Sequence, residues 1–176
     1  MKNNLFIWQF IGVTFTAVLG TFLHFSYGLT NSSFVALFSA VNESTFEHMK
    51  LVFMPSLLFA VIQYFFAKND YNCFWLIKLI GIVVGTLLIP VLFYTLTGSF
   101  SKLSGVTNII IFFVSVFVEY LIEYLLFKKL NCNKKLNFIS FIALIIILLL
   151  FFIFTFYPPK IPLFLDPVTN GYGIVK

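Results

Sequence analysis

Arginine is absent from this chain of 176 residues, and all eleven of its cationic side chains are lysines. Without guanidinium groups to pair with phosphates and base edges, the net charge of +5 gives little support to nucleic-acid binding. Charge is also scarce, because charged residues make up 10% of the sequence, against about 25% in a soluble domain. With 61% hydrophobic residues and so little polar surface, we expect the chain to reside in a lipid bilayer and to bind no nucleic acid.

Five apolar stretches reach the length of about 20 residues that a membrane-spanning helix needs. They cover residues 5–27, 44–67, 73–96, 106–127 and 136–157. The first is too long for the apolar core of a signal peptide, and no small-x-small cleavage site follows it, so we expect an uncleaved helix. The sequence therefore predicts an all-α polytopic membrane protein in which residues 1–176 form a single domain.

Two further segments cannot span a membrane. Phe34 to Val41 is too short, and it is predicted to lie in the interface or to re-enter the bilayer. Residues 158–176 contain four of the six prolines, which cannot continue a helix, so we expect a non-helical tail.

The lysines concentrate at one end of the predicted bundle. That end carries Lys2, Lys68, Lys128, Lys129, Lys134 and Lys135, and the opposite end carries Lys102, Lys160 and Lys176. Cytoplasmic loops are rich in lysine, so we expect the N-terminus inside and the C-terminus outside, in a bacterial cytoplasmic membrane. Cys73 and Cys132 then lie at the cytoplasmic end, where reduced thiols are expected rather than a disulfide.

The start of the second span, "VNESTFEHMK", gathers four ionisable side chains in ten residues. Ser44 and Glu47 have the S-x-x-E spacing of a helix capping box. Glu43, Glu47 and Lys50 follow an i, i+4, i+7 spacing and are predicted to share one helix face. His48 is rotated by about 100° from Glu47, toward a neighbouring helix.

A second histidine is predicted at the same depth. Gly12, Thr16, Gly20 and His24 recur every four residues in the first span, a stripe of mostly small residues that allows close helix contact. His24 is the outermost of the four. Asp166 is the only acid of the tail, which returns to the same surface.

Two imidazoles and nearby carboxylates are suitable ligands for a divalent metal such as zinc, manganese or iron. The candidate residues of an outward-facing site are His24, Asn42, Glu43, Ser44, Glu47, His48, Lys50 and Asp166. Of these, His24, His48 and Asp166 are the predicted metal ligands. No fixed spacing such as H-E-x-x-H is present, so a hydrogen-bonded network without metal is the alternative.

Polar residues also occur inside the fourth span. Asn108, Ser115, Glu119 and Glu123 fall within one face of a helix. Lys78 in the third span matches Glu123 in depth, and we expect an ion pair between them. Glu119 has no cation at its level, so it either carries a proton or lines a wet cavity. On the third span, Gly81 and Gly85 share the face of Lys78 and predict close helix contact.

Three blocks of the sequence resemble a known family. "LHFSYG" (23–28), "LFSAVNESTFEHMKLVFMP" (37–55) and "PLFLDPVTNGYG" (162–173) are similar to an uncharacterised family of small bacterial integral membrane proteins of the Firmicutes type. Its pattern is N-E-S-x-x-E-H-x-K-L with a C-terminal P-L-F-x-D-P block. The resemblance implies no activity, and it covers about a fifth of the chain.

Three classes of function remain open. One is a metal-assisted hydrolase of a lipid or envelope substrate, with Glu47 or Glu43 as general base and Lys50 as a further catalytic candidate. Another is a small proton- or cation-coupled transporter that uses Glu119 and Glu123, and such a short chain would need to form a homodimer. The third is a binding or assembly subunit whose polar groups only fix helix packing.

Overall fold

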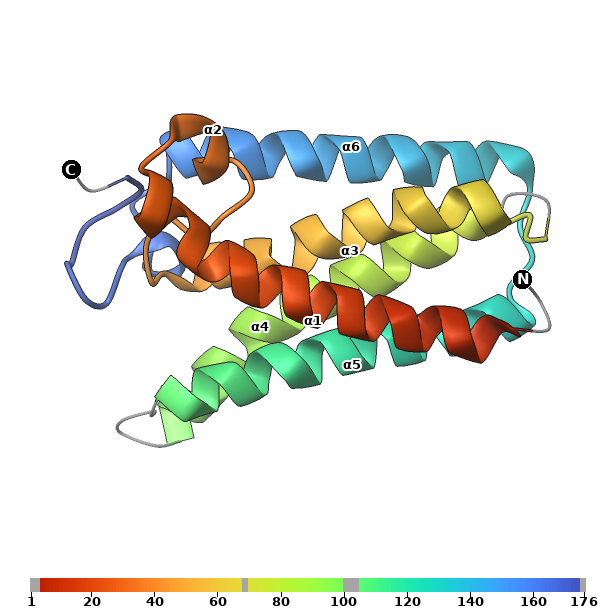
Figure 1. Ribbon diagram of the computed structural model, residues 1–176, viewed down its shortest axis with the longest axis horizontal. Helices are drawn as coiled ribbons and strands as arrows, with labels where there is room; N and C mark the ends of the chain where they lie inside the picture. The colour runs from red at the N-terminus through yellow and green to blue at the C-terminus, as the bar shows by residue number, and fades with distance from the viewer. Residues whose placement is uncertain (1–3, 68–69, 100–104, 175–176) are drawn as a thin grey trace.

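The computed structural model describes residues 4–67, 70–99 and 105–174. Five long helices cross the molecule, and all five are long and apolar enough to span a membrane, as predicted. They are α1 (Leu5–Thr30), α3 (Thr45–Ala67), α4 (Phe74–Ser99), α5 (Gly105–Lys129) and α6 (Lys134–Phe156). Figure 1 shows the two chain termini at opposite ends of the bundle, as an odd number of spans requires.

The remaining elements are short and lie at the end of the bundle where the chain finishes, which we call the C-terminal end (Figure 1). The helix α2 (Ser33–Ala36) and the turns after it occupy the segment that was predicted to be interfacial or re-entrant. The tail is non-helical apart from the single 3-10 turn η2 (Pro162–Phe164). The described residues form no β-strand beyond one isolated bridge between Leu165 and Tyr172.

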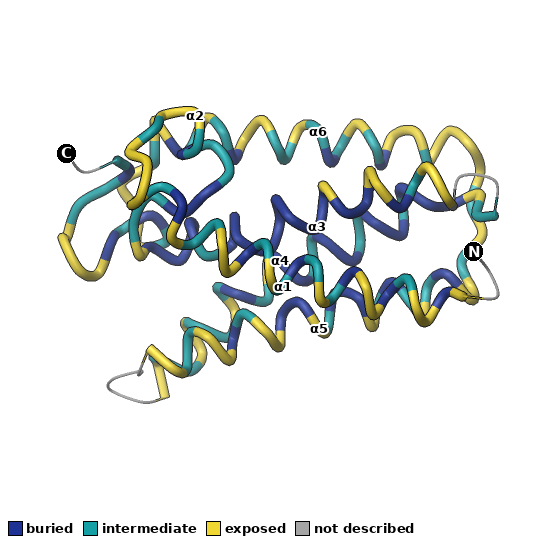
Figure 2. The backbone as a smooth tube through the Cα atoms, viewed as in Figure 1, coloured by how far each residue is buried: buried dark blue, intermediate teal, exposed yellow. Residues whose placement is uncertain are grey.

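Helix α3 is the centre of the bundle. Within its apolar span 67% of the residues are buried, whereas in α6 the share is 22%, the lowest of the five helices. Figure 2 shows the difference as a largely buried α3, whereas α6 consists mainly of exposed and intermediate residues. Helix α6 is therefore the most exposed of the five long helices, and α3 is surrounded by the others.

The small-residue stripe of α1 packs against α3 and α5. A Cβ at Gly20 would lie 2.6 Å from the backbone oxygen of Leu51, so α3 can approach only because no side chain is present. Thr16 uses its hydroxyl in a hydrogen bond of 2.8 Å with the hydroxyl of Tyr120 on α5. This close approach brings the end of α1, with His24, next to the start of α3.

The prediction of two reduced thiols is wrong in this structure. Cys73 and Cys132 form a disulfide that joins the α3–α4 connection to the α5–α6 connection, with their Cα atoms 5.5 Å apart. The sequence indicates the depth of each cysteine but not that these two connections are neighbours. Disulfides persist mainly outside the cytoplasm, whereas the lysine distribution predicts that this end of the bundle lies inside. The two signals oppose each other, and the orientation of the protein in the membrane stays a prediction.

The first testable consequence concerns the α1–α3 contact. Gly20→Ala should lower the free energy of unfolding by about 1–3 kcal/mol, because the new methyl group meets backbone that cannot move aside. Gly28→Ala on the same helix is the matched control, since a Cβ there meets nothing within 4 Å. Thermal unfolding in detergent should show Gly28→Ala unchanged or slightly stabilised, and equal behaviour of the two variants would contradict the contact.

The second concerns the disulfide. In wild-type protein kept oxidised, a maleimide mass tag should label no thiol, and it should add two tags after reduction. Cys132→Ser should be less stable by up to about 4 kcal/mol, because the bond closes a loop between residues 59 positions apart. Two tags without any reductant would show that the thiols are free in the membrane-extracted protein.

Candidate metal centre

The loop before α3 is held by hydrogen bonds at the helix start. Ser44 accepts a bond of 3.4 Å at its hydroxyl oxygen from the backbone N–H of Glu47, which is half of the predicted capping box. The return bond is made by a different residue, since the N–H of Ser44 donates to Oδ1 of Asn42 at 2.9 Å. The Glu47 carboxylate instead accepts from the N–H of Val41 at 3.1 Å. The helix therefore begins at Thr45, and Glu43 lies on the loop rather than on a helix face shared with Glu47 and Lys50.

The Glu47 carboxylate also forms an ion pair with Lys50. The ammonium of Lys50 lies 2.7 Å from Oε2 of Glu47, and both side chains are buried. The same ammonium donates to the backbone oxygen of Ala36 and to the hydroxyl of Thr155, each at 2.9 Å. All three N–H donors of the lysine are used. Lys50 thus connects α2, α3 and α6 near the loop that carries Glu43.

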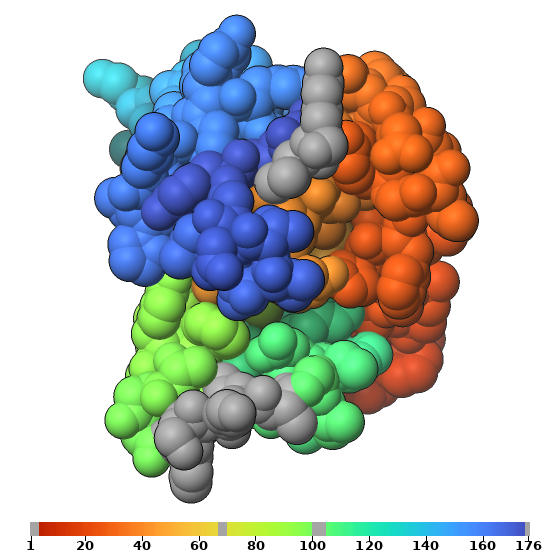
Figure 3. Space-filling model, turned by 90° about the vertical axis from the view of Figure 1, so that its left-hand side faces the viewer, coloured from red at the N-terminus to blue at the C-terminus, as the bar shows by residue number. Residues whose placement is uncertain are grey.

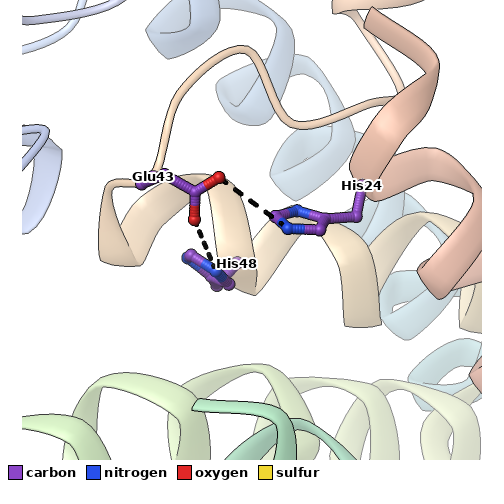
Figure 4. Close-up of side chains that lie close together, drawn as sticks. All are labelled: His24, Glu43 and His48. Carbon is purple, nitrogen blue, oxygen red and sulfur yellow. Dashed lines mark ion pairs between the residues drawn. The ribbon is translucent and has the colours of Figure 1, made fainter. Parts of the chain in front are cut away.

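Three ionisable side chains from separate segments meet at the C-terminal end (Figure 4). Glu43 points from the loop toward His24 of α1 and His48 of α3. Its Oε1 lies 3.7 Å from Nε2 of His24, and its Oε2 lies 3.6 Å from Nε2 of His48. One donor atom from each residue lies within 4.8 Å of the other two. We call these three residues the His–Glu cluster.

The orientation of the His48 ring is fixed from outside the cluster. Its Nδ1 lies 2.9 Å from the backbone oxygen of Ser44, which can only accept, so Nδ1 carries the proton. In the neutral ring Nε2 then presents a lone pair to the Glu43 carboxylate. A backbone oxygen on the other ring nitrogen is the usual second contact of a metal-bound histidine. His24 lacks such a bond, because its Nδ1 is buried with no hydrogen-bond partner among the described residues.

Two cavities adjoin the His–Glu cluster. One, of about 400 Å³, lies between α1, the start of α3 and α5, and its walls are mostly apolar. The other, of about 150 Å³, lies between α3, α4, α5 and the tail. Glu43, His48 and Asn108 line both cavities. The Oδ1 atom of Asn108 is buried and has no hydrogen-bond partner among the described residues.

The tail covers the end of the bundle beside the cluster. Figure 3 shows it lying between the α1–α3 connection and helices α4 and α5. Nδ2 of Asn42 donates to the backbone oxygen of Gly173 at 2.8 Å, which fixes the tail to the loop. Asp166 uses its carboxylate in its own turn, accepting from the N–H of Val168 and from the hydroxyl of Thr169. The tail residues that line the smaller cavity are Pro167 and Val168.

The structure therefore divides the predicted site residues into three groups. His24, Glu43 and His48 come together, Glu47 and Lys50 pair with each other, and the remaining residues organise the loop and the tail. The remaining residues are Asn42, Ser44 and Asp166. Asn108 adjoins the His–Glu cluster, whereas the sequence analysis groups it with the polar residues inside the membrane. Its position in the first turn of α5 indicates that it lies near the membrane surface.

The other predicted polar group lies deep in the bundle. Nζ of Lys78 is 2.6 Å from Oε2 of Glu123, and both side chains are fully buried. The rings of Phe59, Phe74, Tyr120 and Phe127 surround the ammonium at 5.3–5.9 Å from its nitrogen. Glu119 points into the same interior and is also fully buried.

Five apolar helices with a polar cluster at one end define a small multi-pass α-helical membrane protein. The chain belongs to the family of unknown function DUF6512, which matches residues 1–174. The expected membership of an uncharacterised family thus extends over almost the whole chain, and the family carries no activity that could be transferred. No curated protein and no solved structure matches the chain.

The third testable consequence concerns Lys50. Lys50→Met should destabilise the protein by about 3–5 kcal/mol, because it leaves the buried Glu47 carboxylate without its cation. The double variant Glu47→Leu/Lys50→Met should recover part of that loss, since no lone charge remains. Lys160→Met at an exposed position is the control and should unfold like the wild type. Equal stability of Lys50→Met and Lys160→Met would show that the buried pair contributes nothing.

Proposed function

We propose that this protein binds a divalent transition-metal ion, with zinc as the best fit, through His24, Glu43 and His48. The observation that carries the proposal is the pair of distances within the His–Glu cluster. The two imidazole nitrogens lie 3.6 and 3.7 Å from the carboxylate oxygens. A charge-assisted hydrogen bond between a protonated imidazole and a carboxylate would be about 2.7–2.9 Å long. Ligand atoms bound to zinc at about 2.0–2.2 Å in a tetrahedron lie about 3.3–3.6 Å apart. The two imidazole–carboxylate distances, which run to different oxygens of Glu43, are close to this range. One ligand atom from each residue lies within 4.8 Å of the other two, so a modest contraction would place all three around one ion.

The chemistry of the donors supports the same conclusion. The lone pair of His48 Nε2 faces a carboxylate oxygen, and a metal ion between two such acceptors would remove their repulsion. Two imidazoles and one carboxylate suit zinc, manganese and iron, and such three-ligand sets leave a coordination position open to water or substrate. Asp166, the third ligand expected from the sequence, is not among the grouped donors and accepts hydrogen bonds from its own turn.

The two cavities favour metal-assisted hydrolysis of a lipid or envelope substrate as the activity of this centre. A metal with an open position supplies an activated water or polarises an ester or amide oxygen. The larger cavity has apolar walls for a hydrocarbon portion, and Asn108 offers a free amide oxygen to a polar headgroup. On the lysine distribution, the centre would face outward from a bacterial cytoplasmic membrane.

The fourth testable consequence is stoichiometric metal binding. His24 and His48 are the only histidines of the chain, so protein purified without a histidine tag has no other imidazole ligand. Elemental analysis after zinc loading and desalting should give about one zinc per chain. His24→Ala and His48→Ala should each weaken zinc binding by at least about tenfold. Glu43→Gln should weaken zinc binding by a similar or smaller factor.

Asp166→Asn is the matched control, because it alters a buried acid of the same end without touching the His–Glu cluster. It should keep the wild-type metal content. Wild-type protein that retains no zinc, or equal retention by His48→Ala and wild type, would contradict the proposal. Loss of metal in Asp166→Asn alone would instead move the site to the tail.

A further inference from the structure

Helices α4 and α5 enclose a second group of polar atoms, well inside the bundle. A Cβ at Gly85 would lie 2.8 Å from Oε2 of Glu119, and a Cβ at Gly81 would lie 2.9 Å from Oε1 of Glu123. Both carboxylates therefore rest on the bare backbone of α4. Ser115 lies one turn before Glu119 on α5 and is also fully buried.

These atoms have no hydrogen-bond partner among the described residues. Both carboxylate oxygens of Glu119, Oε1 of Glu123 and the hydroxyl oxygen of Ser115 are unpartnered. Thr86, next to Gly85 on α4, has an unpartnered hydroxyl at the same depth. Most buried polar atoms in proteins are hydrogen-bonded, so several unpartnered oxygens on adjoining turns of α4 and α5 point to a ligand or water between these helices.

The unpartnered hydroxyl of Ser115 differs from most of the serine hydroxyls that the structure describes in the long helices. Several other hydroxyls in these helices bond to the backbone oxygen one turn earlier, as Ser140 does with Leu136 and Thr155 does with Phe151, each at 2.8 Å. That local bond satisfies a serine in an apolar helix at no cost in space. Ser115 forgoes it although it is fully buried, so its oxygen remains available on the same face as Glu119.

The charges point to a cation. Lys78 is the cation of this region, and Oε2 of Glu123 already takes its ammonium at 2.6 Å. An ionised Glu119 would leave a net negative charge in the apolar interior, which is costly unless another positive charge binds. The titratable groups near Glu119 are Glu123 and Tyr120 on its own helix and Lys78 on α4. From α3 the Ser56 hydroxyl lies near Glu119, and from α1 the Thr16 hydroxyl contacts both Ser56 and Tyr120.

We propose that Glu119 and Ser115 form a binding site for a small monovalent cation, either sodium or a proton. Carboxylate and hydroxyl oxygens are hard ligands of the kind that sodium prefers over nitrogen or sulfur. Because Gly81 and Gly85 carry no side chain, both carboxylates lie directly against the backbone of α4. A buried acid that exchanges a cation inside a membrane bundle is the basic requirement of an ion-coupled carrier. This site is separate from the His–Glu cluster and does not depend on the metal proposal.

The fifth testable consequence is a cation-dependent stability. The melting temperature of the detergent-solubilised protein is measured as sodium replaces choline at constant ionic strength, at several pH values. For a sodium site, the wild-type melting temperature should rise with sodium and saturate, with weaker apparent affinity at low pH because protons compete for Glu119. Glu119→Gln should abolish the sodium effect, and Ser115→Ala should reduce the apparent affinity about tenfold. Ser140→Ala, whose hydroxyl is satisfied by its own helix, is the control and should behave like the wild type.

Each outcome decides the proposal. A melting temperature insensitive to sodium, with a pH profile that changes in Glu119→Gln and in Ser115→Ala but not in Ser140→Ala, identifies the cation as the proton. No sodium effect together with the same pH profile in wild type and Glu119→Gln overturns the site. If Glu119→Gln does not fold, an unchanged sodium and pH response in Ser115→Ala overturns it instead. The variants His24→Ala and His48→Ala should keep the wild-type cation response, which separates this result from that of the metal centre.

Discussion

The arrangement of segments at the C-terminal end of this protein depends on the interactions of the Lys50 ammonium group. This group is fully buried, so each of its three N–H groups must find an acceptor within the chain. The acceptors come from Glu47 on its own helix, from the backbone of α2 and from α6. Satisfying this one charge therefore joins three segments, and the Glu47 carboxylate in turn holds the loop through Val41. Glu43 faces the two histidines because the loop that carries it is fixed in this way.

The ionisable groups of the bundle follow two patterns. Lys50 with Glu47, and Lys78 with Glu123, are closed pairs at 2.7 and 2.6 Å, in which each charge has its partner. The His–Glu cluster and Glu119 are open, because their atoms are too far apart to bond or have no partner among the described residues. Closed pairs fix helix packing, whereas open groups contain oxygen or nitrogen atoms that can still bind a ligand. On this distinction the first two pairs are structural and the other two groups are candidate binding sites.

Much of this arrangement could be predicted from the sequence because it follows from helical periodicity and depth. The five spans follow from apolar length, and the shared level of His24 and His48 follows from the stripe that ends at His24. Depth alone also matched Lys78 with Glu123. Contacts between non-helical segments could not be predicted in this way. The disulfide needed the proximity of two connections, and the partners of Lys50 include the backbone oxygen of Ala36, which has no signature in the side-chain pattern. Asn108 was placed on the correct helix face, but its cavity depends on where the tail lies.

The central claim is that two imidazoles and one carboxylate hold a metal ion. X-ray absorption spectroscopy at the zinc edge, on tag-free protein loaded with one equivalent of zinc, tests it most directly. We expect a first shell of nitrogen and oxygen at about 2.0–2.2 Å, with outer-shell scattering from two imidazole rings that falls to one ring in His24→Ala. A first shell with sulfur near about 2.3 Å, or one of oxygen alone without imidazole scattering, would contradict it.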